Sequence, residues 1–239
     1  MKDQAVYALI LSGGTGLRCA TDVPKQYLKS TGKMMITHCM EALCSSERVR
    51  KLVIIADETY RKAIEDEWKS SGSRGEILAF GEPGANRQLS IWNGLKLLQG
   101  IAAEGDIVLV HDAARPFVTA ALIDRCLNAC ADHEGAMPVL PMKDTVYLTG
   151  ADGRVNGLLE RDRVVAGQAP EAFLYGKYLA ANESLLPEKI LSIRGSSEPA
   201  ILAGMDVVVV DGDEKNRKVT TPTDLENYYG HFQGEETRN

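Results

Sequence analysis

The chain of 239 residues lacks the features that typify membrane, secreted and nucleic-acid-binding proteins. None of its apolar runs approaches the ~18 residues that a membrane-spanning helix needs. Its five cysteines are few and odd in number, which favours free thiols in a reducing compartment over a set of disulfides. Lysine and arginine number 27 against 33 acidic residues, and the resulting net charge of −6 argues against general binding to nucleic acid. We therefore expect a cytoplasmic protein that binds neither membranes nor nucleic acids.

Internal repeats, low-complexity tracts and a linker-like composition are also missing from the sequence. The first apolar run, residues 6–11, leads into Ser-Gly-Gly and not into a signal-peptidase site, so we interpret it as a strand. A chain of this length, with an ordinary hydrophobic content of 44%, can bury a substantial core. We expect one domain over residues 1–239.

Short apolar runs alternate with helical patterns along the chain. The runs are almost continuously apolar, as is typical of parallel strands covered on both faces. The expected strands are residues 6–11, 51–56, 76–80, 106–111, 136–140 and 207–210, and the expected helices are residues 58–70, 88–100, 119–133 and 220–229. This alternation predicts an α/β, Rossmann-like fold: a doubly wound, mostly parallel sheet that binds ligands at the carboxyl ends of its strands.

Two of the expected helices carry clear start signals. Thr119 precedes the third helical pattern and is a suitable N-cap residue. Before the last helix, Thr221 takes the N-cap position, Pro222 the first helical position and Asp224 the first turn.

The segment of residues 143–164 interrupts the alternation of strands and helices. It reads as two strands of mixed polar and apolar residues around a Gly-Ala-Asp-Gly turn, which predicts a β-hairpin arm inserted into the domain. A two-stranded arm has little core of its own, so we expect it to pack on a second copy of the chain in a homodimer.

A glycine-rich turn follows the first expected strand. Gly13, Gly14 and Gly16 allow backbone N–H groups to approach an anion closely, although glycines alone also suit a plain tight turn. The pattern lacks the Gly-Lys-Ser/Thr of a P-loop and the third glycine of a dinucleotide-binding fingerprint. Arg18 and Lys25 favour a different ligand, because a guanidinium and an ammonium beside glycine N–H groups suit a polyphosphate.

Three further positions carry charges that suit phosphate chemistry. Asp112 ends an expected strand, where a carboxylate can hold Mg²⁺ against phosphates; the alternative is that it only caps the turn that follows. Lys218 lies between the last expected strand and the last helix, and Arg161 lies on the return limb of the arm. Each of these two cations is a solvated surface charge unless the fold brings it to a site.

Six motifs occur in order over nearly the whole chain. They read LSGGTGLR with PKQYL, GANRQLSIWNGL, HDAARPF, PMKDTV, AGQAPEAF and KVTTPTDL. In this combination the sequence resembles the cytidylyltransferases that act on 2-C-methyl-D-erythritol 4-phosphate, and their relatives that act on ribitol 5-phosphate.

The resemblance implies a nucleotide-diphosphosugar-transferase-like fold, a homodimer with interlocking arms, CTP as a substrate and Mg²⁺ as a cofactor. It implies that the phosphate of a polyol phosphate attacks the α-phosphorus of CTP and releases pyrophosphate. The nucleophile is already an anion, so no general base is needed, and the residues offer no obvious acid–base pair.

The resemblance also implies roles for individual residues. Arg18, Lys25, Arg161 and Lys218 match residues of the transfer machinery, and Arg18 with Lys25 match the pair that stabilises the transition state. The implied CTP-binding residues are Leu11, Ser12, Gly13, Gly14 and Gly16 at the triphosphate, Gly84, Ala85 and Ser90 at the cytosine, Asp112 as the Mg²⁺ ligand and Ala113 at the ribose. The implied acceptor-binding residues are Arg115, Thr145, Arg161 and Lys218, of which Thr145 and Arg161 lie on the arm and would serve the neighbouring subunit.

Several residues depart from the pattern of the 2-C-methyl-D-erythritol 4-phosphate enzymes. Ser12 begins the glycine turn, and Tyr147 stands where those enzymes usually have a basic residue. These departures favour a ribitol-type acceptor slightly, and Ala85 replaces a polar residue often seen near the cytosine. Two alternatives stay open: an NAD(P)-dependent oxidoreductase with a Rossmann fold, and a CTP-binding module without activity.

Overall fold

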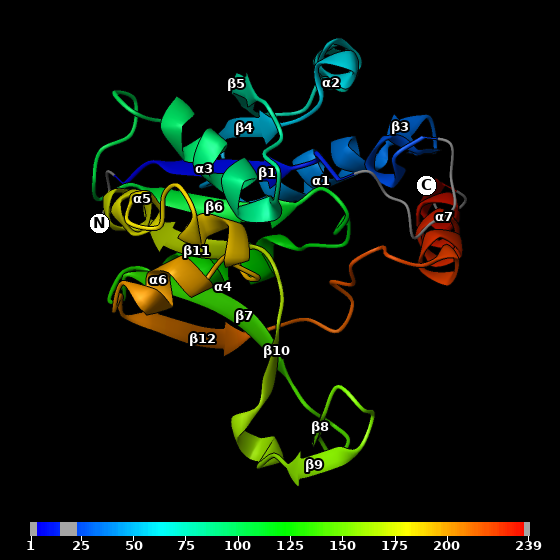
Figure 1. Cartoon of the computed structure of the whole chain (residues 1–239). Coiled ribbons are helices and arrows are strands. Elements are labelled where there is room, and N and C mark those ends of the chain that lie inside the picture. Colours follow the sequence, from blue (N-terminus) through cyan, green and yellow to red (C-terminus); the bar gives the residue numbers. More distant parts are fainter. Residues whose placement is uncertain (1–3, 15–22, 237–239) are drawn as a thin grey trace.

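A twisted sheet runs through the middle of the computed structural model, which describes residues 4–14 and 23–236 (Figure 1). Within these residues the sheet has eight strands, with β12 beside β7 and the remaining order β10-β7-β11-β6-β1-β4-β5. Their bounds are β1 Val6–Leu11, β4 Lys51–Ile55, β5 Glu76–Gly81, β6 Ile107–Asp112, β7 Gly135–Pro141, β10 Val165–Gly167, β11 Glu171–Leu174 and β12 Val207–Asp211. All six predicted strands are present, each within a residue or two of its predicted ends.

The sheet is mostly parallel, as predicted. β1 pairs in parallel with β4 and with β6, β4 pairs in parallel with β5, and β12 pairs in parallel with β7. β10 and β11 are antiparallel to their neighbours and were not predicted. β11 lies between β6 and β7 and is only four residues long, with a glutamate at its start, which gives it no strand-like pattern.

Helices cover both faces of the sheet, and alternation along β1 shows how the core divides. Ala8 and Ile10 face one core, which α1, α2 and α4 complete, whereas Tyr7 and Leu9 face a second core with α3 and α5. The helices are α1 Met35–Cys44, α2 Glu58–Ser70, α3 Arg87–Leu97, α4 Ala120–Ala129, α5 Tyr175–Glu183, α6 Glu198–Leu202 and α7 Pro222–Glu236. Short elements add η2 Lys25–Tyr27, η3 Arg161–Arg163, η4 Lys189–Ser192 and a small hairpin of β2 Lys29–Ser30 and β3 Lys33–Met34.

The predicted helix starts are confirmed. The Thr119 hydroxyl accepts a hydrogen bond from the Leu122 N–H at 3.3 Å, and α4 begins at the next residue. Before α7, the Thr221 hydroxyl accepts from the Asp224 N–H, and the Asp224 carboxylate accepts from the Thr221 N–H at 2.8 Å. The helices α1 and α5 were missed because neither has a side-chain N-cap bond that would signal its start.

The predicted arm is also confirmed as a hairpin. It contains β8 Tyr147–Thr149 and β9 Val155–Leu158, and it projects away from the body of the molecule (Figure 1). Gly153 has a φ of +77° and donates its N–H to the Gly150 carbonyl, which closes the predicted turn. In the part of the chain that the structure describes, no helix combines the length and the apolar character needed to cross a membrane.

Candidate active site

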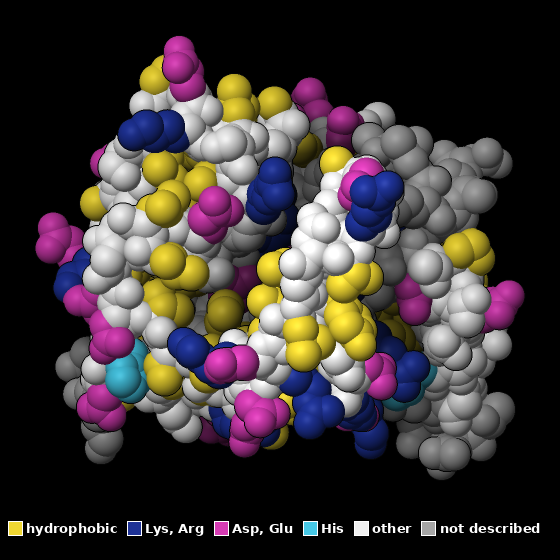
Figure 2. All heavy atoms as spheres, turned by 60° about the horizontal axis from the view of Figure 1, so that its bottom comes forward, with side chains coloured by type: hydrophobic (Ala, Val, Ile, Leu, Met, Phe, Trp, Pro, Cys, Tyr) yellow, Lys and Arg dark blue, Asp and Glu magenta, His cyan; other side chains and the backbone are white. Residues whose placement is uncertain are grey.

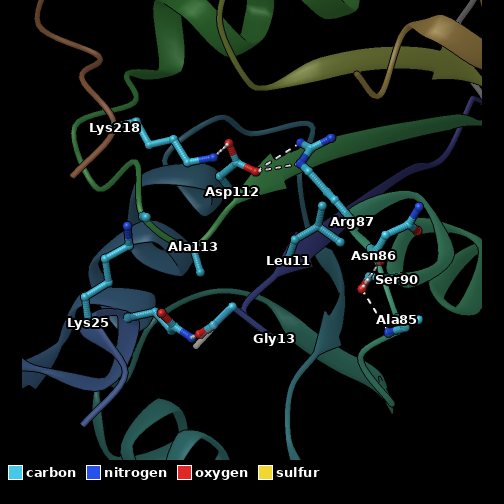
Figure 3. A pocket seen from close by; sticks show the side chains of 14 residues that line it. Leu11, Gly13, Lys25, Ala85, Asn86, Arg87, Ser90, Asp112, Ala113 and Lys218 are labelled. Atoms are coloured by element: carbon cyan, nitrogen blue, oxygen red, sulfur yellow. Dashed lines mark hydrogen bonds and ion pairs between the residues drawn. The ribbon is translucent and has the colours of Figure 1, made fainter. Parts of the chain in front are cut away.

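A cavity of about 610 Å³ opens where β1 and β6 end, at the carboxyl edge of the sheet (Figure 3). The last residues of these strands, Leu11 and Asp112, both line it. Its other lining residues are Gly13, Gly14, Lys25, Gln26, Gly84, Ala85, Asn86, Arg87, Ser90, Ala113, Ala114 and Lys218. The structure therefore brings together most of the predicted nucleotide-binding residues at the place where the fold predicts a ligand.

Hydrogen bonds to Ile55 and from Gln26 hold the start of the glycine turn in place. Ser12 donates its N–H and its hydroxyl to the Ile55 carbonyl, at 2.9 and 2.7 Å. From the other side, the Gln26 side chain donates to the carbonyls of Ser12 and Gly14, both at 2.6 Å. Since the carbonyls are held in this way, the backbone conformation at residues 12–14 is fixed beside the cavity.

Gly13 is required by close packing. A Cβ atom at this position would lie 2.5 Å from the Cβ of Pro83, which is closer than two carbon atoms can approach. Gly16 and Arg18, which the sequence also assigns to this turn, lie outside the described residues.

Lys25 begins the short helix η2 and lines the cavity with only 8% of its surface exposed. Pro24 precedes it with a φ of −55°, which holds the start of η2 in one conformation. Figure 3 shows its side chain at the wall of the cavity, on the same side as Ala113. An ammonium group in this position would attract a phosphate strongly, because it is largely shielded from solvent.

Asp112 is surrounded by cations. Lys218 donates to its Oδ2 at 2.9 Å, Arg87 donates to its Oδ1 from Nε at 3.1 Å and from Nη2 at 3.0 Å, and the Nε of Arg115 lies 3.6 Å from Oδ2. Burial alone would raise the pKa of Asp112, but these positive charges hold the pKa well below its usual range. The carboxylate is therefore ionised at any physiological pH.

Arg87 is the site residue that sequence reasoning missed. It is the first residue of α3 and reaches Asp112 from the side opposite to Lys218 (Figure 3). Asn86 caps this helix by accepting a hydrogen bond from the Leu89 N–H at 2.8 Å, which makes Arg87 the first residue of the helix. The motif GANRQLS contains Arg87, but an arginine in the first turn of a helix usually points to solvent, so nothing local marks it.

The three residues expected near the cytosine form one small structure. The Ser90 hydroxyl accepts the Gly84 N–H at 2.9 Å and donates to the Asn86 carbonyl at 3.0 Å, so it closes the loop before α3. A Cβ on Gly84 would lie 2.4 Å from the Cβ of Leu89. Ala85 lies between them and lines the cavity. These contacts leave the tip of the loop facing the cavity.

Arg115 is not among the cavity-lining residues. Its side chain is largely buried beside Asp112 and donates to the carbonyl of Asn216 at 2.9 Å. The Val219 N–H donates to the Ala114 carbonyl at 2.8 Å, so the two contacts bind the segment before α7 to the turn after β6. In the structure Arg115 lies beside Asp112 and holds the backbone at Asn216, two residues before Lys218; a contact with the acceptor stays a prediction.

Thr145 and Arg161 lie on the arm and do not line the cavity of their own chain. They line a separate hollow of about 430 Å³, where Arg161 donates to the Lys143 carbonyl at 3.0 Å. Within one chain the structure therefore does not bring these two residues together with Lys25 and Lys218.

Glu171 is a second charged residue that the sequence did not assign. It is 9% exposed and accepts a hydrogen bond from the Ser196 hydroxyl through Oε1, while Oε2 has no hydrogen-bond partner among the described residues. Burial raises the pKa of this carboxyl, against the opposing effects of the Ser196 hydroxyl and the Arg87 charge. Glu171 thus lies behind Arg87, in the same electrostatic network as Asp112.

Comparison with known proteins gives the class of this molecule. The profile of the family described as IspD: 2-C-methyl-D-erythritol 4-phosphate cytidylyltransferase matches residues 6–228. The 2-C-methyl-D-erythritol 4-phosphate cytidylyltransferase of Geobacter metallireducens is 34% identical over 92% of this chain and 94% of its own length. A bifunctional enzyme IspD/IspF of a Bradyrhizobium species is 33% identical over 93% of this chain, which spans only 55% of that protein.

A solved structure agrees with this assignment at the level of the fold. The 4-diphosphocytidyl-2C-methyl-D-erythritol synthase of Anaerococcus prevotii matches with a TM-score of 0.80 at 23% identity, over 96% of this chain and 99% of its own. The protein is thus a nucleotidyltransferase built on the predicted α/β fold. More particularly, the chain belongs to the 2-C-methyl-D-erythritol 4-phosphate cytidylyltransferase family. The lean towards a ribitol acceptor finds no support in these matches, which do not favour the oxidoreductase or the inactive module either.

Proposed function

We propose that this protein transfers the cytidylyl group of CTP to 2-C-methyl-D-erythritol 4-phosphate. In this reaction an oxygen of the acceptor phosphate forms a bond to the α-phosphorus of CTP. The bond from that phosphorus to the oxygen of the β-phosphate breaks, and pyrophosphate leaves with the electron pair. The observation that carries the proposal is the cavity that holds Lys25, Asp112 and Lys218 beside a glycine turn at the carboxyl edge of the sheet.

Mg²⁺ fits the donor set of this cavity. Asp112 provides an ionised carboxylate at the end of β6, and Mg²⁺ commonly takes one or two carboxylates together with oxygens of substrate phosphates and waters. We propose Asp112 as its protein ligand. When bound, Mg²⁺ would neutralise phosphate charge and hold the phosphates in line for displacement.

The chain's own residues supply positioning and positive charge. The fixed backbone of residues 12–14 would receive the triphosphate, and Lys25 would stabilise the negative charge that grows on the oxygens around the α-phosphorus. Lys218 contacts Asp112 and would orient the acceptor phosphate. The acceptor phosphate is an anion throughout, so no side chain has to remove a proton.

We further propose that the arm completes the site of a second copy of the chain. Tyr147, Leu148, Val155 and Leu158 on the arm are each more than half exposed, at 56, 52, 64 and 66%. Figure 2, in which the arm comes forward, shows hydrophobic side chains exposed along it. Apolar residues gathered in this way favour burial against a partner. A symmetric homodimer would place Thr145 and Arg161 of one copy at the cavity of the other.

A substrate panel tests the proposed reaction. Pyrophosphate release would be measured with Mg²⁺ and CTP against 2-C-methyl-D-erythritol 4-phosphate and ribitol 5-phosphate in parallel, with ATP, GTP and UTP as control nucleotides. We expect release with CTP and the methylerythritol phosphate, at least about 10-fold faster than with any other pair. Faster release with ribitol 5-phosphate would overturn the acceptor, and no release with any polyol phosphate would overturn the reaction.

A matched pair of variants links the reaction to the cavity. Asp112→Asn keeps the shape of the side chain but removes the charge that would bind Mg²⁺, so we expect kcat to fall by about 10² or more. Asp66→Asn changes an exposed carboxylate on α2 and should leave kcat unchanged. Equal rates for the two variants would show that the reaction takes place elsewhere.

A further inference from the structure

Asp112 already faces three positively charged side chains. Arg87 takes Oδ1 with two donors, and Lys218 and Arg115 lie at Oδ2. A divalent cation at this carboxylate would have to displace at least one of them, because an oxygen of Asp112 cannot face an ammonium or guanidinium group and bind a metal from the same direction.

Arg87 and Lys218 are the partners that can leave. Their side chains are 34 and 36% exposed, whereas that of Arg115 is 13% exposed and is bound to the backbone at Asn216. Of these two, only Arg87 carries a guanidinium group, which can offer a phosphate two parallel hydrogen bonds. Arg87 lines the cavity, so its guanidinium group borders the space where a triphosphate would lie. Glu171 is close enough to interact electrostatically with Arg87, and its Oε2 has no hydrogen-bond partner among the described residues, so it offers a further acceptor near the guanidinium group.

Positive charges outnumber negative charges around Asp112. Among the described residues, the Asp112 carboxylate faces three cations, Arg87, Arg115 and Lys218, and Lys25 also lines the cavity. A bare divalent cation would therefore enter a region that is already positive, which is unfavourable at these short distances. A triphosphate brings several negative charges and offers the guanidinium group a bidentate partner.

We propose that Arg87 is a nucleotide-binding residue that exchanges partners: it guards Asp112 in the empty site and moves to the triphosphate when the metal arrives with the nucleotide. As a result, a divalent cation binds at Asp112 only together with the nucleotide. This inference rests on the proposed function. It adds Arg87 to the proposed nucleotide-binding residues and predicts that the divalent cation does not bind before the nucleotide.

Direct measurement of metal binding tests the inference without turnover. Mn²⁺ would be titrated into the purified full chain and followed by electron paramagnetic resonance, with and without the non-hydrolysable analogue α,β-methylene-CTP. For the wild type we expect Mn²⁺ to bind at least about 10-fold more tightly to the protein when the analogue is present, after correction for Mn²⁺ held by the analogue alone. Equal affinity under the two conditions would overturn the inference.

Arg87→Gln tests which residue guards the carboxylate. The loss of two charge-assisted hydrogen bonds should let Mn²⁺ bind about 10-fold more tightly in the absence of the analogue, and should weaken binding of the analogue by a similar factor. Arg61→Gln removes an arginine that pairs with Glu82 outside the cavity lining, and should change neither affinity. Arg87→Lys serves as a second variant if the first does not fold, with smaller shifts in the same directions.

The outcomes separate this inference from the proposed function. If the wild type releases pyrophosphate from CTP but Arg87→Gln binds Mn²⁺ as weakly as the wild type does, the reaction stands and Arg87 does not guard Asp112. If the wild type releases no pyrophosphate with any acceptor yet shows the Mn²⁺ behaviour, the exchange stands and the reaction is wrong.

Discussion

The cavity and the arm contain the same kinds of side chain in opposite situations. In the cavity, Lys218 and Arg87 contact a buried carboxylate that the fold brings to them from residues 106 and 25 positions away. On the arm, Arg161 has its side chain 51% exposed and lies near the carboxylate of its own neighbour Asp162, at 3.7 Å. A group of charges made from distant parts of the chain is held by the whole fold, whereas the ion pair of Arg161 joins neighbouring residues.

The two regions also differ in what stabilises their conformation. Cavity residues stand on strands and helix starts that both hydrophobic cores support. The arm consists of two short strands, and a hairpin of this size is marginal by itself in water. The charge cluster of the cavity is therefore formed within one chain, whereas the proposed role of the arm requires a partner.

The strongest way to break the cavity is to remove Lys25. We expect Lys25→Ala to lower kcat by about 10² or more, because the lysine would stabilise charge that develops only in the transition state. Lys29→Ala is the matched control: this nearby lysine has its side chain 59% exposed in an ion pair with Glu67 and should leave kcat within about twofold. Steady-state rates of pyrophosphate release decide the matter, and a near-normal kcat for Lys25→Ala would remove Lys25 from the mechanism.

Mixing two inactive variants tests whether the arm serves a partner. Lys25→Ala damages the cavity of its own chain, and Arg161→Ala would damage the cavity of its neighbour. A mixed dimer then has one intact site, so an equal mixture of exchanging subunits should recover about a quarter of wild-type activity. The recovery would be assayed as pyrophosphate release after the two proteins are unfolded and refolded together. Activity no higher than the mean of the separate variants would place Arg161 outside the partner's site.

Much of the fold could be predicted from the sequence, because strand and helix patterns are local. The strand β1 and the helix α2 have the bounds that their residues predict, and the caps at Thr119 and Thr221 follow from side chains within three positions. The antiparallel strand β11 was missed, because the direction in which a short strand pairs depends on its neighbours in space and not on its own residues.

The site divides in the same way. Lys25 and Asp112 were found because each adjoins a recognisable local feature, the glycine turn or a strand end. Arg87 and Glu171 were missed because their importance comes only from what the fold places beside them. Charge pairing across the sequence leaves no periodic or local signal, so a tertiary structure is needed to see it.

A subtler effect should appear in how pH changes the stability around the cavity. Burial raises the pKa of Glu171 above its usual range, so the folded chain holds a proton there that the unfolded chain releases. This contribution to the free energy of unfolding is present at low pH and is lost as pH rises from the usual pKa of a glutamate through the raised pKa. Glu171→Gln should therefore lose less stability than the wild type as pH rises above the usual pKa of a glutamate, about 4.3.

Denaturant unfolding at a series of pH values measures this difference. Glu58→Gln, at an exposed position of α2, is the control and should follow the wild type throughout. A Glu171→Gln curve parallel to that of the wild type would show that Glu171 is ionised alike in the folded and unfolded chains.

A substitution on the arm should change the stability of the single chain least, but it should strongly weaken the proposed dimer. Leu158 is 66% exposed, so Leu158→Ser should alter the free energy of unfolding of the single chain by no more than about 0.5 kcal/mol. The same substitution adds a polar group to the apolar surface that we expect to bind a partner. Light scattering at micromolar concentration should show a dimer for the wild type and a monomer for Leu158→Ser. A wild-type monomer, or a variant dimer of unchanged affinity, would contradict the proposed role of the arm.

The way the arm joins the sheet would allow it to be replaced during evolution. The last residue of β7, Pro141, and the first residue of β10, Val165, are register partners in the sheet. Two chain ends that already face each other can be joined by a short turn or by a different insertion, with the ladder below them unchanged. Residues 142–164 could therefore be replaced without a change in the pairing of β7 with β10. Under the proposed role of the arm, such a replacement would change the contacts to the acceptor and leave the cavity at the carboxyl edge of the sheet as it is.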